Sequence, residues 1–144
     1  MNPKKSSSPI PAVAVADQFG RTGKRLALAF DDALAVHGVS TSRARVLMEV
    51  AATGPVRLTV VAAAVGIAQG TTSELVEALV REELLSRSPD PSDRRAVLLE
   101  ATTKGHEHAD RWAAAYAAAA EELFGALGED QRVDFLALLK ALEP

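Results

Sequence analysis

The chain has 144 residues, of which 48% are hydrophobic but only 4% aromatic, and its formal net charge is −3. This length suffices for one domain with a buried core, and a core built from Ala, Val and Leu favours helices, because Ala and Leu carry the lowest helical cost. The chain contains no cysteine, which excludes disulfides, thiolate catalysis, thiol-based redox sensing and Cys-ligated metal sites.

The charge is unevenly distributed along the chain. Residues 1–40 carry five basic and three acidic groups, residues 41–101 carry seven and eight, and residues 102–144 carry four and eight. For a nucleic-acid partner the distribution matters more than the sum. The nearly balanced first two thirds are therefore compatible with DNA binding.

Residues 1–16 are expected to form a disordered tail, since three serines and three prolines surround a short apolar stretch that is a poor signal peptide. No apolar run in the sequence approaches the roughly 18 residues of a membrane span. We therefore expect a soluble, cytoplasmic protein with no membrane partner.

Two helices are predicted in the first third of the chain. Apolar residues at alternating spacings of three and four predict a long helix over residues 17–37, which Gly38 can end as a left-handed cap. Ser40 or Thr41 then caps a second helix that runs to about Ala52, where a Gly-Pro turn ends it.

The middle of the chain has the pattern of a helix-turn-helix followed by a hairpin. Residues 56–58 form a short strand candidate, Thr59 is a plausible N-cap for a third helix ending at Gly66, and a fourth helix spans about residues 69–82. The connection between these two helices has the length of a helix-turn-helix turn.

Two short β-prone runs, residues 85–88 and 96–100, flank a charged tip at residues 89–95 in which two prolines stiffen the loop. From Thr103 to Gly125 the pattern is helical again, and a last helix follows Gly128.

The element order predicts a mainly α fold with a small β-wing: a winged helix-turn-helix with flanking dimerisation helices. Residues 17–144 then form a single domain whose DNA-binding core spans about residues 41–101. The outer helices, about residues 17–37 and 103–142, carry apolar stripes too long for such a core to cover, and a second copy of the chain is the simplest partner.

Three segments resemble the MarR family of bacterial transcription regulators. Residues 90–99 (DPSDRRAVLL) with Thr102–Gly105 resemble the family's wing signature, residues 58–67 the first helix and turn of its DNA-reading motif, and residues 75–79 the buried face of its recognition helix. The resemblance covers about residues 17–142. It implies an obligate dimer, recognition helices in successive major grooves of a palindromic operator, wings at the minor groove, and in many relatives a small aromatic or phenolic acid as effector.

The chain departs from the family pattern around the recognition helix. Ala68 stands where Ser or Thr commonly caps this helix, while Thr71 and Glu74 have capping-box spacing, so the helix starts either at residue 69 or later. Glu83 replaces a usual glycine at the helix end. Residues 69–74 include no basic side chain.

The wing carries the first candidates for DNA contact. Arg94 and Arg95 can neutralise phosphates or enter a narrow minor groove. Alternatively, they form local ion pairs with Asp90 and Asp93.

Further candidates lie on the second and fourth helices. Gln69 can read adenine, and Thr71, Thr72 and Ser73 can contact phosphates or a thymine methyl group, although all four also suit helix capping. Arg43 and Arg45 either contact backbone phosphates from the second helix or lie on a solvated face.

Other chemistry has little support in the sequence. His106 and His108 lie two residues apart on a helix and point to different sides, and His106 with Asp110 supplies only two ligands, so we expect no metal. His37, Trp112 and Tyr116 either line a ligand pocket or pack, and the sequence identifies no ligand-binding residue. No nucleophile elbow, phosphate-binding glycine loop or dinucleotide fingerprint occurs, so neither an enzyme nor a cofactor is expected.

Two hypotheses follow. The first is a homodimeric, sequence-specific DNA-binding regulator, a repressor relieved by a small organic ligand. The alternative is a winged-helix protein-interaction module or antirepressor with little DNA affinity, which the net acidity and the absence of basic residues in the recognition helix favour.

Overall fold

The computed structural model of the chain describes residues 8–144. Its elements follow in the order α1 (Ala12–Ala35), α2 (Thr41–Thr53), β1 (Val56–Arg57), α3 (Leu58–Val65), α4 (Gln69–Arg81), β2 (Leu85–Asp90), β3 (Asp93–Ala101), α5 (Thr103–Phe124) and α6 (Glu129–Ala141). The three strands form one antiparallel sheet in the order β1-β3-β2. This confirms the predicted mainly α fold with a small β-wing.

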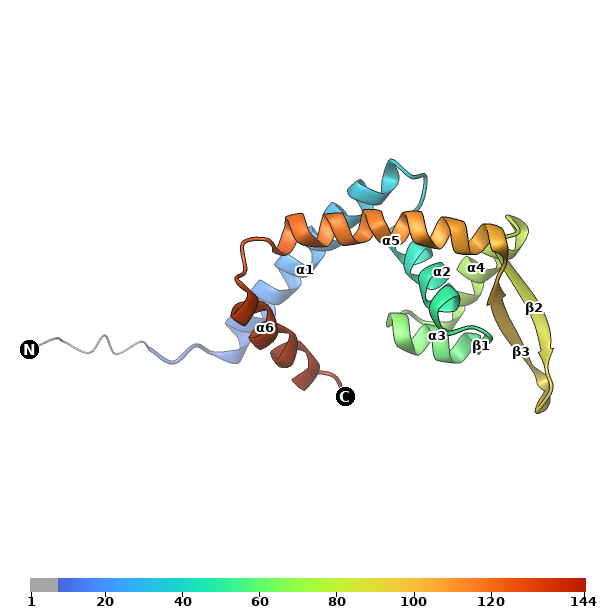
Figure 1. Cartoon of the computed structure of the whole chain (residues 1–144). Coiled ribbons are helices and arrows are strands. Elements are labelled where there is room, and N and C mark those ends of the chain that lie inside the picture. Colours follow the sequence, from blue (N-terminus) through green and yellow to red (C-terminus); the bar gives the residue numbers. More distant parts are fainter. Residues whose placement is uncertain (1–7) are drawn as a thin grey trace, which may run out of the picture.

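The elements separate into two regions joined by one long helix (Figure 1). Helices α2, α3 and α4 and the sheet form a lobe, and the β2–β3 hairpin projects from it as a wing. Helix α5 crosses the molecule from this lobe to the opposite end, where α1 packs against it and α6 lies beside α1.

The core fills the lobe and the side of α5 that faces it. Its largest fully buried side chains are aliphatic, as the composition requires, and Trp112 of α5 is the single large aromatic residue among the described members of the cluster. The core side chains that the lobe contributes include Leu47, Val50, Val61, Val76, Leu79, Leu84, Leu85 and Leu99.

The first helix is longer at its start than the periodicity predicts. Helix α1 begins at Ala12 rather than at residue 17, so residues 12–16 belong to the helix and not to a disordered tail. The physical reason is that Pro11 is accommodated at the N-cap and the following Ala-Val run adds little helical cost. The rest of the expected tail, residues 1–7, lies outside the described residues.

The ends of α1 and α2 otherwise follow the expected capping chemistry. Gly38, with φ of +69°, lies in the left-handed region after α1. The hydroxyl of Ser40 accepts a hydrogen bond from the backbone N–H of Arg43 and so caps α2, as predicted.

The helix-turn-helix has its expected geometry, with α3 and α4 turned by 111° relative to each other. Helix α3 begins at Leu58 with Arg57 at its N-cap, so Thr59 is not the cap. Helix α4 begins at Gln69, and Ala68 provides no side-chain cap, so the later start suggested by Thr71 and Glu74 is wrong. Packing of the apolar face of α4 sets its start without a capping side chain.

The wing strands are longer than the β-prone runs. Strand β2 continues to Asp90 and β3 starts at Asp93, so the tip shrinks to a turn at Pro91–Ser92. Proline is tolerated at position 89 because β2 is an edge strand of the sheet. The register shifts between Pro89 and Asp90.

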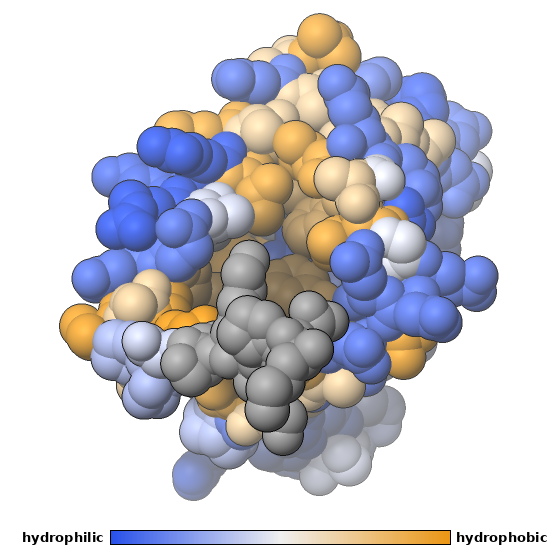
Figure 2. Space-filling view, turned by 90° about the vertical axis from the view of Figure 1, so that its left-hand side faces the viewer, coloured by the Kyte–Doolittle hydropathy of each residue, from blue (hydrophilic) through white to orange (hydrophobic). Residues whose placement is uncertain are grey.

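The end of the molecule formed by α1 and α6 exposes much apolar surface. None of the 13 residues of α6 is buried, and nearly all large apolar side chains exposed among the described residues lie on or next to these two helices, including Ile10, Val13, Phe19, Leu28, Val133, Leu136 and Leu138. Figure 2 views this end and shows apolar residues lining a hollow between hydrophilic rims.

Within residues 8–144 no single helix is long and apolar enough to cross a membrane; α3 and α4 reach the required composition only as a sharply bent pair.

Glu83 follows α4 with φ of +61°, the left-handed conformation in which a side chain carries a steric cost of roughly 1–2 kcal/mol. The glycine usual at this place in the family would carry no such cost. We predict that Glu83→Gly raises the free energy of unfolding by about 1 kcal/mol, net of glycine's greater freedom in the unfolded chain, in urea denaturation at a fixed protein concentration.

The matched control is Glu83→Ala, which removes the same charge but keeps a Cβ. Equal stability of the glycine and alanine variants would contradict the backbone explanation.

Candidate nucleic-acid interface

Helix α4 presents the expected DNA-reading side chains only in part. Gln69 and Thr71 are exposed and Ser73 is half-buried. Thr72, however, is fully buried and donates its hydroxyl to the carbonyl oxygen of Ala68 at 3.0 Å. Thr72 is therefore a core residue, and its expected contact with DNA is wrong. Its place on the same helical stripe as Val76 and Leu79 is the reason.

The exposed face of α4 carries no cation over most of its length. Glu74 and Glu77 are exposed on it, and the basic residue of the helix is Arg81 in the last turn. Positive charge for DNA must therefore come from neighbouring elements.

Asp90 anchors the tip of the wing. Its carboxylate, 8% exposed, accepts hydrogen bonds from Arg57 Nε at 2.9 Å and Nη2 at 2.6 Å, and from Ser92 N at 2.9 Å and Oγ at 2.7 Å. The hydrogen bonds from Ser92, and next the one from Arg57, lower the pKa of Asp90 to about 2. The wing is thus tied to β1, the strand that leads into the helix-turn-helix.

The two wing arginines are left free by this arrangement. Arg94 and Arg95 are both exposed, and neither forms an ion pair within residues 8–144. Asp93 accepts a hydrogen bond from the backbone N–H of Arg95 at 3.0 Å rather than from a guanidinium. The alternative of ion pairs between these arginines and Asp90 or Asp93 is therefore wrong, because Arg57 and the turn backbone occupy the carboxylates.

The two arginines of α2 have different surroundings. Arg43 forms an ion pair with Glu82, and its guanidinium carbon lies 5.7 Å from the centroid of the Trp112 ring. Neither of the predicted alternatives, a phosphate contact or a solvated face, describes this side chain. Arg45 is half-buried and has no ion pair within the described residues, so its phosphate contact stays a prediction.

The histidines and aromatic residues of α5 pack. His108 Nδ1 lies 2.9 Å from the carbonyl oxygen of Lys104, and its ring meets Trp112 edge-on. Tyr116 stacks on Phe30 of α1 at 4.9 Å between ring centroids. Among the residues that the structure describes, no three potential ligands are grouped to hold a metal.

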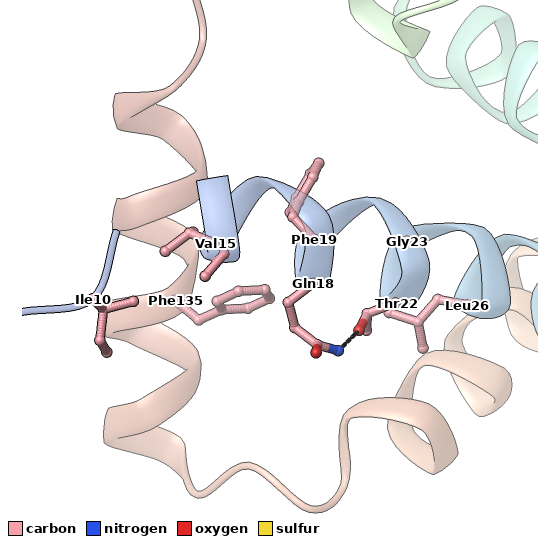
Figure 3. A pocket seen from close by; sticks show the side chains of 9 residues that line it. Ile10, Val15, Gln18, Phe19, Thr22, Gly23, Leu26 and Phe135 are labelled. Atoms are coloured by element: carbon pink, nitrogen blue, oxygen red, sulfur yellow. Dashed lines mark hydrogen bonds between the residues drawn. The ribbon is translucent and has the colours of Figure 1, made fainter. Parts of the chain in front are cut away.

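Two hollows flank the ends of α5. The first, of about 350 Å³, lies between α2 and α5, with an alanine-rich wall and His106 and Asp110 at its polar side; Met48, Ala51, Ala52, Ala109 and Ala113 complete it. The second, of about 440 Å³, lies between α1 and α6 (Figure 3), where Phe135 of α6 faces Val15 and Phe19 of α1. Its one hydrogen bond among the residues drawn joins Gln18 to Thr22 at 2.8 Å.

Comparisons with known proteins agree with this geometry. A family model described as the MarR family matches residues 39–97. The transcriptional repressor NicR of Pseudomonas putida is 35% identical over 79 residues, which span 55% of this chain and 50% of NicR.

Two solved structures share the fold. BpsR of Bordetella bronchiseptica, studied for the regulation of its DNA binding by 6-hydroxynicotinic acid, is 26% identical, with a TM-score of 0.81 over 90% of this chain and 98% of that one. A mutant of MarR from E. coli in complex with operator DNA is 18% identical, with a TM-score of 0.82 over 92% of this chain and 96% of that one. These relatives are regulators, which confirms that no enzyme activity is to be expected.

The Asp90 anchor generates a pH prediction. Because the pKa of Asp90 falls from its ordinary 3.8 to about 2 in the folded protein, its contribution to stability is complete above pH 3.8 and is lost as the pH falls toward 2. We predict that Asp90→Asn is less stable than the parent at neutral pH, and that the two converge as the pH falls through this window in thermal melts.

Ser92→Ala, which keeps the backbone donor but removes the hydroxyl, should lie between the two proteins. Parallel stability curves for parent and Asp90→Asn over the whole acid range would refute the anchoring role.

Proposed function

Since the chain belongs to the MarR family of winged helix-turn-helix transcriptional regulators, we propose that it is a homodimeric repressor that binds a palindromic operator in the cytoplasm. The observation that carries this proposal is the wing, in which Arg94 and Arg95 project free of internal ion pairs from a tip anchored by Asp90.

The wing supplies the affinity in this proposal. A pair of guanidinium groups on a stiff hairpin can neutralise phosphates or enter a narrow minor groove without first breaking internal contacts. The side chain of Arg57, which holds the tip, is itself taken up by Asp90. Arg57 therefore positions the wing, while Arg94 and Arg95 contact DNA.

Helix α4 supplies the discrimination. Gln69 at its start is exposed, and an amide can pair bidentately with adenine in the major groove. Thr71 and Ser73 contact phosphates or a thymine methyl from the same turn. Since Glu74 and Glu77 leave this helix without attraction for phosphate, binding depends on the wings to hold α4 in the groove.

Two copies of the chain are needed to cover the apolar end. Burying exposed apolar surface contributes roughly 25 cal/mol per Å², and α6 has no buried residue with which to stay folded alone. The groove between α1 and α6 (Figure 3) is open and apolar, so the same two helices of a second copy fill it in the self-complementary manner of a two-fold dimer.

The hollow between α2 and α5 suits a small aromatic acid. Its alanine wall can pack a flat ring, His106 can hydrogen-bond a carboxylate, and Asp110 can accept from a hydroxyl or ring N–H. It lies between a helix of the DNA-binding lobe and the helix that carries the dimer, so a bound ligand can change their separation. The ligand of BpsR, 6-hydroxynicotinic acid, has this chemistry.

The alternative function is a winged-helix protein-interaction module with little DNA affinity. The acidic face of α4 favours it, and the free wing arginines oppose it. The salt titration below distinguishes the two.

Arg94→Ala and Arg95→Ala test the wing. Because a phosphate contact is independent of sequence, each loss should weaken binding to all fragments alike, and should reduce the slope of log affinity against log salt by about one per contact, or about two for a dimer with two wings. Gln69→Ala should instead relax discrimination at one operator position by about 1–3 kcal/mol. Fluorescence anisotropy over a salt series measures all three.

Arg111→Ala, which removes the same charge from an exposed position of α5, is the control and should leave the slope unchanged. If both wing variants fold and keep the parent's affinity and slope, the wing is structural and the interaction-module hypothesis gains support.

The effector proposal is tested with 6-hydroxynicotinic acid and salicylic acid as probes. We predict binding by calorimetry and a matching loss of operator affinity, both reduced at least several-fold by Ala109→Leu, which fills the hollow. Binding of either acid that the leucine substitution leaves unchanged would place the ligand elsewhere.

A further inference from the structure

The turn at residues 82–84 is the point where α4 ends and the wing begins. Its backbone is fixed to α4 by the hydrogen bonds that Glu82 N donates to Ala78 O at 3.1 Å and Leu84 N donates to Leu79 O at 2.9 Å. Strand β2 follows directly at Leu85. Any displacement of this turn therefore moves the recognition helix and the wing together.

The first turn of α5 grips this turn closely. Thr102 donates its hydroxyl to Glu83 O at 2.7 Å and its backbone N–H to Leu84 O at 3.1 Å, and Lys104 Nζ donates to Glu82 O at 3.1 Å. A Cβ at position 105 would collide with the carbonyl of Leu84, so Gly105 is what permits this approach.

Arg43 adds a link from α2 to the same place. Its side chain is 20% exposed, pairs with the carboxylate of Glu82, which is 48% exposed, and lies over the ring of Trp112 from α5. Its Nε is buried with no hydrogen-bond partner, so the ion pair with Glu82 is the compensation for burying this charge. One side chain thus joins α2, the end of α4 and α5.

We propose that Arg43 and Glu82, seated on Trp112, form a junction that fixes the angle between the DNA-binding lobe and α5, and thereby the separation of the two recognition helices in the dimer. Arg43 and Glu82 are then positioning residues that select operators by half-site spacing. This inference rests on the proposed function, because spacing has meaning only for a dimer that reads two half-sites.

The spacing of half-sites is a sensitive readout of this role. Each added base pair moves one half-site by about 3.4 Å and rotates it by roughly 34° about the duplex axis, so a rigidly held pair of lobes tolerates one spacing. A junction that served only stability would change the melting temperature and leave the relative affinities for different spacings as they are.

The test uses the palindromic duplex that the parent selects from a random pool, remade with the half-sites one or two base pairs closer or farther apart. We expect the parent to prefer its own spacing sharply. Glu82→Gln should lower the ratio of affinities between the selected and the altered spacings by roughly 2- to 30-fold, the range of typical coupling changes. Thermal melts confirm that the variant is folded.

Glu77→Gln is the matched control. It removes the same charge from an exposed position of the same helix, where no contact with the junction exists among the described residues. It should keep the parent's spacing ratios, so any general effect of one fewer negative charge near DNA is separated from the loss of the junction.

A second measurement works without DNA. Because the chain has no cysteine, a single spin label at Ala64→Cys, an exposed position on α3, reports the distance between the lobes of a dimer by pulsed electron spin resonance. The distribution should broaden when Glu82→Gln is added.

Unchanged spacing ratios, or an unchanged distance distribution, in the Glu82→Gln protein would overturn the junction while leaving the proposed function intact. A parent that selects no duplex or shows no distance between labels would overturn the proposed function and the junction with it.

Discussion

The close contact between the start of α5 and the carbonyl of Leu84 is the constraint on which the rest of the structure depends. Gly105 permits it, and Thr102 and Lys104 hold it with hydrogen bonds to the turn after α4. Because α1 packs on the same helix farther along, this one contact connects the lobe with the end that carries the exposed apolar faces.

The molecule divides its arginines between holding and binding. Arg43 and Arg57 are both paired with carboxylates, Glu82 and Asp90, and each pair joins segments distant in sequence. Arg94 and Arg95 have no such partner within the described residues. The net charge of −3 therefore says little about a DNA partner, because what matters is which cations remain free and whether the backbone beneath them is fixed.

The sequence was sufficient for the parts of the fold that follow from local rules. Three-four periodicity located the helices, Ser40 identified a cap, and the replacement of glycine by Glu83 pointed to the left-handed turn that the structure contains. Counting along α4 could also have identified Thr72 as buried, since it lies four residues before Val76 on the apolar stripe.

The long-range contacts could not be predicted in this way. Arg57 and Asp90 are 33 residues apart, and no local pattern distinguishes a paired arginine from a free one. The same holds for Arg43 and Glu82. The choice between solvated arginine, internal ion pair and phosphate contact is made by the packing of α2, α4, α5 and the sheet, which becomes visible only once these elements are assembled.

The central claim is that two copies of this chain act together on one duplex. Sedimentation equilibrium of the protein alone, and then with a short palindromic fragment from the upstream region of its own gene, tests it most directly. The account predicts a dimer at micromolar concentration and a complex of two protomers per duplex. A stable, folded monomer, or a complex of one protomer per duplex, would contradict it.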